Sequence, residues 1–126
     1  MNGLVDQIMV RGACSPEALN KLALTGALLV CDCEGYEDTL LNPAQAPGLA
    51  ECDFLVELHD FNNPQITTNF IQRFSRTHHI RLIPSVNRNP DLYPSLWFLK
   101  DRRDREIALS EQRVPMNWAY GTVRRK

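Results

Sequence analysis

This sequence of 126 residues has no long apolar run, and that absence argues against several classes of protein. No stretch approaches the ~20 apolar residues of a membrane-spanning helix. The first residues also lack the basic-then-apolar pattern of a secretory signal. The composition, 44% hydrophobic and 23% charged, is that of an ordinary globular protein. We therefore expect one cytoplasmic domain over residues 1–126, with no membrane partner.

Motifs built on cysteine, glycine or a nucleophilic serine are also missing. The four cysteines form no C-x-x-C pair and no cysteine–histidine set at zinc spacing. Cys31 and Cys33 lie two apart on an expected strand, where neighbouring positions cannot easily form a disulfide, so we interpret the cysteines as free thiols. The six glycines form no G-x-G-x-x-G loop and no phosphate-binding loop, and no G-x-S-x-G turn occurs.

Net charge is nearly absent, at −1, but the two halves of the sequence differ strongly. Residues 1–62 hold 2 basic and 10 acidic side chains, whereas residues 63–126 hold 12 basic and 5 acidic ones. Either the halves attract each other within the fold, or the second half presents a basic surface to a phosphate-bearing or acidic partner. We do not expect nucleic-acid binding, because the arginines are scattered and accompany no known reading motif.

The clearest feature present is the stretch ALLVCDCEGYE, residues 27–37. Its apolar first part, Ala27–Cys31, predicts a strand buried on both faces, as in a parallel sheet covered by helices. Acidic residues follow immediately at Asp32, Glu34 and Glu37. Because open α/β sheets bind ligands at the carboxyl ends of their strands, the stretch predicts a site there.

Helical and strand patterns alternate along the chain and predict an α/β fold. We expect a mostly parallel sheet of about four strands flanked by helices, with the last strand antiparallel. The expected helices begin at Ser15-Pro16-Glu17, at Tyr36 and at Thr67 or Thr68, which would cap the third helix. The expected strands after the first are residues 53–60, 79–86 and 107–113, followed by a basic C-terminal tail over residues 114–126.

A second polar strand end, Glu57-Leu58-His59-Asp60, would meet the first if the two strands are parallel neighbours. We assign catalytic roles to Asp32, Glu34 and His59, because such groups can act as general acid or base. The substrate-binding candidates are Glu57, Asp60, Glu111 and Arg113. The last two would share one face of the fourth strand, and the alternative for them is an ion pair with each other. The alternative for Glu37 and Asp38 is a structural role at the positive end of a helix.

The motif Asp32-Cys33-Glu34-Gly35-Tyr36-Glu37, followed by Leu40-Leu41, resembles the D-x-E-G-x-E…L-L signature of FkbM-like methyltransferases. Residues 54–59 resemble the strand that follows in this family. The resemblance covers about residues 27–113 and corresponds to the C-terminal half of the family's domain, from the fourth strand onward. It implies a partial Rossmann-like, class I fold whose complete form uses S-adenosylmethionine. Asp32 and Glu34 would then line the methionine or acceptor side of the cofactor pocket.

Several parts of that family's domain have no counterpart in this sequence. The preceding half would carry three strands, the glycine-rich loop and the acidic residue that binds the cofactor's ribose. We therefore expect the chain by itself to be inactive and not to bind S-adenosylmethionine tightly. We also expect a homodimer, or a complex with a partner chain, through the exposed edge near Ala27–Cys33. The alternative is that residues 1–13 fold over this edge as a substitute strand.

Three functions remain open from the sequence. The favoured one is a methyltransferase-like domain that acts, in its complete form, on an oxygen of a small or sugar-like acceptor; it assigns no metal ligand. The second is a non-catalytic, dimeric binding module that kept the half-fold and lost the cofactor site. The third is a metal-dependent hydrolase whose metal site is formed by Asp32, Glu34, His59 and Asp60.

Overall fold

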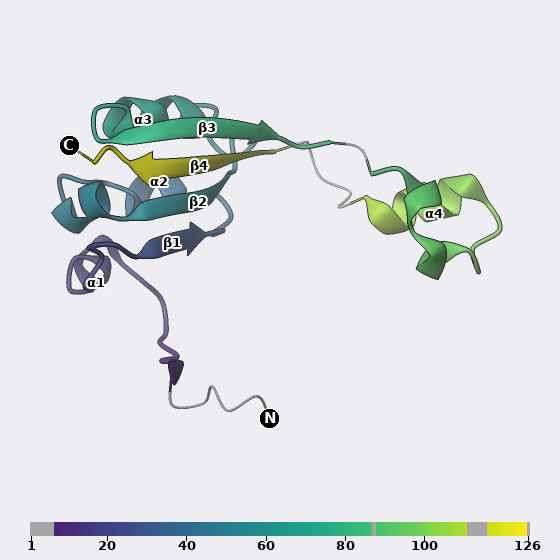
Figure 1. The fold of residues 1–126 in the computed structure, drawn as a ribbon, viewed down its shortest axis with the longest axis horizontal. Helices are drawn as coiled ribbons and strands as arrows, with labels where there is room; N and C mark the ends of the chain where they lie inside the picture. Colours follow the sequence, from purple (N-terminus) through teal and green to yellow (C-terminus); the bar gives the residue numbers. More distant parts are fainter. Residues whose placement is uncertain (1–6, 87, 111–115, 126) are drawn as a thin grey trace.

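The computed structural model describes residues 7–86, 88–110 and 116–125, which form an α/β fold around one four-stranded sheet (Figure 1). The strands are β1 (Leu28–Cys31), β2 (Asp53–Leu58), β3 (His78–Pro84) and β4 (Asn117–Val123). The α-helices are α1 (Pro16–Leu19), α2 (Glu37–Leu40), α3 (Ile66–Phe74) and α4 (Arg102–Leu109), and the short 3-10 helices are η2 (Pro47–Glu51), η3 (Pro90–Leu92) and η4 (Pro94–Leu96).

The sheet is mixed, with the strand order β1-β2-β4-β3. β1 pairs with β2 in parallel, whereas β4 runs antiparallel to both of its neighbours, β2 and β3. The expectation of a mostly parallel sheet is therefore wrong, although the last strand is antiparallel as expected. Because β2 and β3 both oppose β4, the three strands β1, β2 and β3 all run in the same direction.

The C-terminal part of the chain differs most from the expectation. The strand expected over residues 107–113 begins inside helix α4, which Asp101 caps by accepting a hydrogen bond of 2.7 Å from the Arg103 N–H. Residues 111–115 lie outside the described residues. The expected basic tail contains β4, which lies in the interior of the sheet. A short apolar run within a polar segment suits either structure, and here the N-terminal cap favours the helix.

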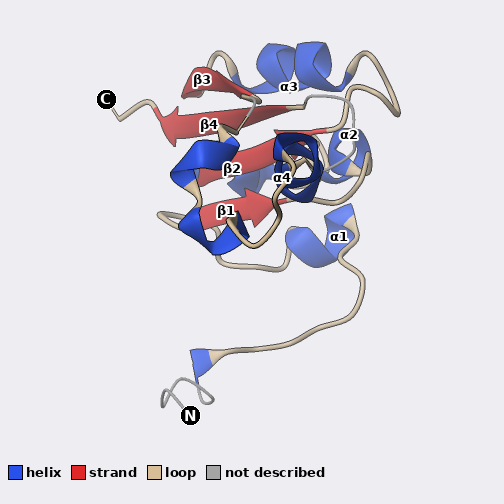
Figure 2. Cartoon of the chain, turned by 90° about the vertical axis from the view of Figure 1, so that its right-hand side faces the viewer, coloured by secondary structure: helices blue, strands red, loops and turns tan. Residues whose placement is uncertain are grey.

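Helices α1, α2 and α3 lie on the same side of the sheet (Figure 2). The side chains of Phe54, Val56 and Leu58 alternate along β2 toward this side, and all three are fully buried. They pack against residues of the three helices and of the neighbouring loops, among them Leu19, Leu40, Leu41, Ala46, Leu49, Ile66, Phe70 and Phe74. This single core between helices and sheet holds the first polar strand end in position.

The opposite face of the sheet is open near β1. Leu28 and Val30 are 57% and 62% exposed, so β1 is not buried on both faces as its apolar sequence predicted. β1 is also the edge strand, and no described residue pairs with its outer side. Residues 7–13 form no strand there, and residues 1–6 lie outside the described residues. An apolar edge strand exposed in this way is a ready site for pairing with another chain.

Aromatic packing fixes the centre of the core. The ring of Phe54 lies 4.7 Å from that of Phe74, 5.7 Å from Phe70 and 4.6 Å from the imidazole of His78, measured between centroids. Opposite Phe54 on β4 stands Gly121. A Cβ at Gly121 would lie 3.2 Å from the Phe54 ring, which explains why this strand position has no side chain.

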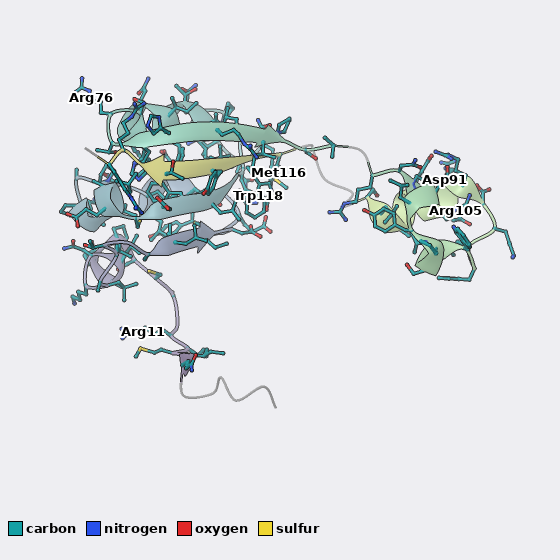
Figure 3. The ribbon with its side chains drawn as sticks, viewed as in Figure 1. Arg11, Arg76, Asp91, Arg105, Met116 and Trp118 are labelled. Atoms are coloured by element: carbon teal, nitrogen blue, oxygen red, sulfur yellow. The ribbon has the colours of Figure 1, made fainter. Side chains whose placement is uncertain are left out.

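Residues 88–110, with η3, η4 and α4, stand apart from the sheet (Figure 1). Within this segment Asp91 binds Arg102 at 2.6 Å and lies 3.8 Å from Arg105 (Figure 3). Its apolar residues remain exposed, as shown by Trp97 at 58% and Phe98 at 72%. None of the helices in the described part of the chain has the length and apolarity needed to cross a bilayer.

Candidate functional site

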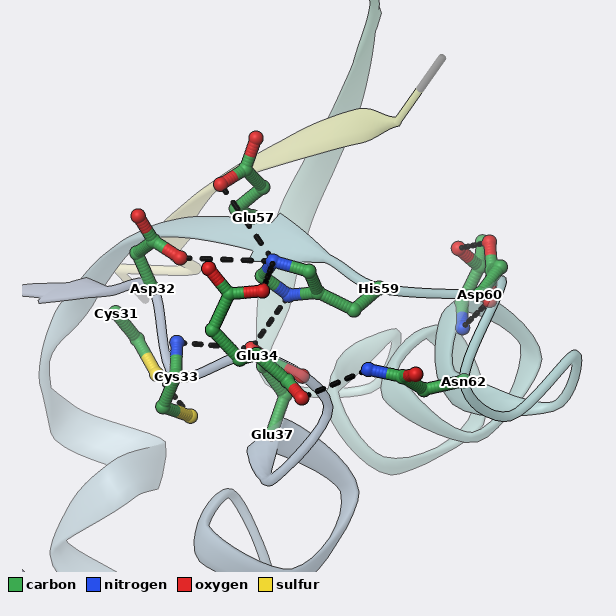
Figure 4. A network of polar contacts seen from close by, with 10 residues as sticks. Cys31, Asp32, Cys33, Glu34, Glu37, Glu57, His59, Asp60 and Asn62 are labelled. Atoms are coloured by element: carbon green, nitrogen blue, oxygen red, sulfur yellow. Dashed lines mark hydrogen bonds and ion pairs between the residues drawn. The ribbon is translucent and has the colours of Figure 1, made fainter. Parts of the chain in front are cut away.

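The carboxyl ends of β1 and β2 meet at one edge of the sheet. The two strands are parallel, and Cys31 at the end of β1 pairs in register with Val56. The residues that follow, Asp32 on one side and Glu57 to His59 on the other, therefore come together (Figure 4). The convergence expected from the two polar strand ends is confirmed for these residues.

His59 lies at the centre of this cluster, and its side chain is fully buried. Its Nε2 atom lies 3.6 Å from Asp32 Oδ1, 3.6 Å from Glu34 Oε2 and 3.7 Å from Glu57 Oε2. These separations are too long for hydrogen bonds. Nε2 has no hydrogen-bond partner among the residues the structure describes. Three carboxylates thus surround one imidazole nitrogen without bonding to it.

The other nitrogen of His59 is held by Glu37. The Glu37 carboxylate is 1% exposed, and its Oε1 lies 2.7 Å from His59 Nδ1. The same oxygen accepts a hydrogen bond of 3.0 Å from the backbone N–H of Cys33. Because an ionised carboxylate only accepts hydrogen bonds, Nδ1 carries the proton and donates it. The other ring nitrogen, Nε2, then faces the carboxylates.

Glu37 is the residue whose role the sequence left open, because an acidic residue at a helix start is common for structural reasons alone. Its buried position shows that it orients His59 instead of serving as an exposed helix-end charge. The signal that could have identified it is its place as the last acidic residue of the D-x-E-G-x-E motif.

The loop that carries Glu34 has an uncommon backbone conformation. Glu34 has a φ of 54° and Gly35 a φ of 102°, both in the left-handed region. Asn62 holds this loop by donating a hydrogen bond of 2.8 Å from Nδ2 to the Glu34 carbonyl. A Cβ at Gly35 would lie 2.7 Å from the same Nδ2, so only glycine fits here. Asn62 was not among the residues singled out from the sequence.

Two sets of candidate residues do not belong to the cluster as described. Asp60 lies apart from it (Figure 4), and its carboxylate accepts a 2.9 Å hydrogen bond from the Thr67 N–H in the first turn of α3. Asp60 is thus a structural residue, and it fills the capping role expected of Thr67 or Thr68. The remaining substrate-binding candidates, Glu111 and Arg113, lie outside the described residues.

The cysteines beside the site are free thiols, as expected. The sulfur atoms of Cys31 and Cys33 lie 3.5 Å apart without a disulfide. Burial raises the pKa of the Cys31 thiol to about 11 and, together with the nearby Cys31, raises that of Cys33 further. Both thiols are therefore protonated near pH 7, and neither is an activated nucleophile or a ready metal ligand.

The cluster opens to solvent on one side. The side chains of Asp32 and Glu34 are 51% and 58% exposed, whereas Glu57 and His59 form its buried wall. One ligand atom each from Asp32, Glu34 and His59 lies within 4.8 Å of the others. Such an arrangement could hold a divalent cation, accept hydrogen bonds from hydroxyl groups, or take a proton from a bound ligand.

Comparison with known proteins adds no assignment. No family model matches the chain, and neither the curated proteins nor the solved structures contain a match.

Proposed function

We propose that this chain forms part of a methyltransferase-like domain that resembles the FkbM-like enzymes. The complete domain would transfer the methyl group of S-adenosylmethionine to an oxygen of a small or sugar-like acceptor. The observation that carries the proposal is the position of the D-x-E-G-x-E motif. Its acidic residues lie at the carboxyl end of β1, next to the polar end of the parallel neighbour β2.

The direction and order of the strands support this proposal. In a doubly wound sheet the fourth, fifth and sixth strands follow one another outward from the centre and run in one direction. β1, β2 and β3 lie in this order across the sheet and run in one direction. The oppositely directed β4 is inserted between β2 and β3. In the complete domain a further strand would pair with the outer side of β1, where Leu28 and Val30 are exposed.

The cluster offers the groups that methyl transfer to oxygen requires. An acceptor hydroxyl placed among Asp32, Glu34 and Glu57 can donate hydrogen bonds to their carboxylates. With the cofactor bound in the complete domain, one of these carboxylates would take the hydroxyl proton as the oxygen bonds to the methyl carbon, while the sulfur–methyl bond breaks to leave S-adenosylhomocysteine. The exposure of Asp32 and Glu34 leaves them accessible to a ligand approaching from the β1 side.

A chimera tests the assignment. The first three strand–helix units of an FkbM-like methyltransferase are joined to this chain at Ala27, and binding of S-adenosylmethionine is measured by calorimetry. We expect micromolar binding by the chimera and no binding of that strength by the present chain. By the resemblance Asp32 would also line the methionine side of the cofactor pocket. Asp32→Asn should therefore weaken binding to the chimera about 10-fold, which is the loss of one hydrogen bond to a charged group, about 1.5 kcal/mol.

The matched control for the chimera is Asp60→Asn, because Asp60 belongs to α3 and not to the cluster. It should leave the affinity unchanged. A folded chimera that binds no S-adenosylmethionine would contradict the proposal, and so would equal affinities of the Asp32→Asn and unsubstituted chimeras.

A second candidate function, a dimeric binding module, is favoured by the open edge of β1. Antiparallel pairing of β1 with β1 of a second copy would bury the same edge on both chains, as a two-fold interface requires. We expect light scattering to give twice the 14.4 kDa mass of one chain. Val30→Lys should yield the monomer, because a lysine on an edge strand opposes pairing of that strand with another chain.

The control for this experiment is Val86→Lys, since Val86 is also an exposed valine, at 75%, but lies beyond β3 on the far side of the sheet from β1. This variant should remain dimeric. A wild-type monomer at the highest attainable concentration would exclude pairing through β1, as would a Val30→Lys variant that is still a dimer.

A further inference from the structure

We propose that Asp32, Glu34 and His59 bind one divalent transition-metal ion, Zn²⁺ or Mn²⁺, with Glu57 beside it. The inference rests on the geometry of the cluster and holds whether or not the domain transfers methyl groups. Its starting point is His59 Nε2, a fully buried nitrogen without a hydrogen-bond partner among the described residues. Leaving such an atom unsatisfied is unfavourable, so a buried polar atom of this kind calls for an explanation.

The separations around Nε2 have the size of distances between ligands of one ion. Histidine nitrogen and carboxylate oxygen bind zinc at about 2.0–2.2 Å, so two ligands of a tetrahedral ion lie about 3.3–3.6 Å apart. The observed separations are 3.6 Å from Nε2 to both Asp32 and Glu34, and 3.7 Å to Glu57. Figure 4 shows the three carboxylates around Nε2, and the ligand atoms of Asp32, Glu34 and His59 lie within 4.8 Å of one another.

The contact between Glu37 and His59 has the form that metal-binding histidines use. Such histidines donate their second ring N–H to a carboxylate or carbonyl, which fixes the tautomer and the ring orientation. Glu37 Oε1 accepts from Nδ1 at 2.7 Å and so leaves the lone pair of Nε2 directed at Asp32, Glu34 and Glu57. The ring cannot turn away without breaking this buried contact.

The mixed donor set indicates the type of ion. Carboxylate oxygens alone would suit Mg²⁺ or Ca²⁺, whereas an imidazole nitrogen favours transition metals. The exposed sides of Asp32 and Glu34 leave room at the ion for water or for a ligand oxygen. An ion bound there would polarise that oxygen and lower the pKa of its proton.

Titration of the present chain with metal alone tests this inference. The protein is treated with EDTA, dialysed, and titrated calorimetrically with MnCl₂, ZnCl₂ and MgCl₂, and bound Mn²⁺ is also followed by electron paramagnetic resonance. We expect one Mn²⁺ or Zn²⁺ per chain at micromolar or lower concentration, with weaker binding of Mg²⁺. The Asp32 side chain is half exposed, so Asp32→Asn should leave the fold intact. This variant should weaken metal binding at least 10-fold. His59→Gln should abolish it.

Two further variants sharpen the result. Glu37→Ala leaves all proposed ligands in place but removes the acceptor of His59 Nδ1, and should weaken binding about 10–100-fold, as loss of an orienting partner does. His79→Gln replaces an exposed histidine of β3 and should bind as the wild type does. The inference is overturned if the folded wild type binds neither ion below millimolar concentration. It is equally overturned if Asp32→Asn keeps wild-type affinity. Because no S-adenosylmethionine is present, this outcome is separate from that of the chimera.

Discussion

Replacing Glu37 with alanine should lower the free energy of unfolding by about 2–4 kcal/mol, although the residue contributes nothing to the apolar core. The substitution removes the acceptor of two buried donors, His59 Nδ1 and the backbone N–H of Cys33. Each donor left without a partner costs about 1–3 kcal/mol. Urea unfolding in the presence of EDTA measures the loss independently of any bound metal.

Glu37→Gln is the matched variant, because its amide oxygen can still accept both hydrogen bonds. It should cost only about 1 kcal/mol, the difference between a charged and a neutral acceptor. A double-mutant cycle of Glu37→Ala with His59→Ala should give a coupling of about 1.5–3 kcal/mol, the range for hydrogen bonds to charged groups. Equal stabilities of the alanine and glutamine variants would show that Glu37 does not hold His59.

The elements that sequence reasoning located correctly are those whose signals are local. Ser15 caps α1 by accepting a hydrogen bond of 3.2 Å from the Ala18 N–H, as the Ser-Pro-Glu start indicated. The apolar positions Phe70 and Phe74 of α3 are buried as expected, although Ile71 between them is 36% exposed. The strands β1, β2 and β3 lie within one or two residues of their expected positions. Each of these features depends on a few neighbouring residues.

The features that were missed depend on which segments meet in space. An apolar run such as Ala27–Cys31 predicts a strand, but local apolarity does not say whether a layer of helices covers each face. Only the arrangement of the whole sheet leaves Leu28 and Val30 uncovered. The residues of β4 combine two aromatic side chains with Gly121 and are followed directly by basic residues, a pattern typical of a tail as much as of a strand. Its place between β2 and β3 follows from pairing with both.

In the candidate site, too, some residues could be identified from local sequence, whereas others depend on which segments meet in space. Asp32, Glu34, Glu57 and His59 could be proposed because polar residues at the ends of adjacent parallel strands must lie close together. Asp60, one residue further along, points to α3 instead. Which of several neighbouring acidic residues faces the site depends on the backbone of the loop. That backbone is in turn fixed by Gly35 and by a distant amide, Asn62.

Phe54→Ala should destabilise the protein more than any other single change considered, by about 4 kcal/mol. Phe54 is fully buried and contacts Phe70, Phe74 and His78, so the variant would leave a cavity between the sheet and α3. Truncation of a buried phenylalanine to alanine typically costs about 3–5 kcal/mol. With a urea dependence of about 1–3 kcal/mol/M, the unfolding midpoint should fall by about 1.3–4 M.

Two further variants separate loss of packing from loss of an aromatic ring in general. Phe54→Leu keeps most of the apolar volume but loses the ring contacts, and should cost only about 1–2 kcal/mol. Phe98→Ala removes a ring that is 72% exposed in the segment beyond β3, and should change stability by less than about 0.5 kcal/mol. If Phe54→Ala were no more harmful than Phe98→Ala, the core could not lie between β2 and α3. The carboxyl ends of β1 and β2 would then lose the support that brings Asp32 and His59 together, because β2 is the strand that connects this core to the site.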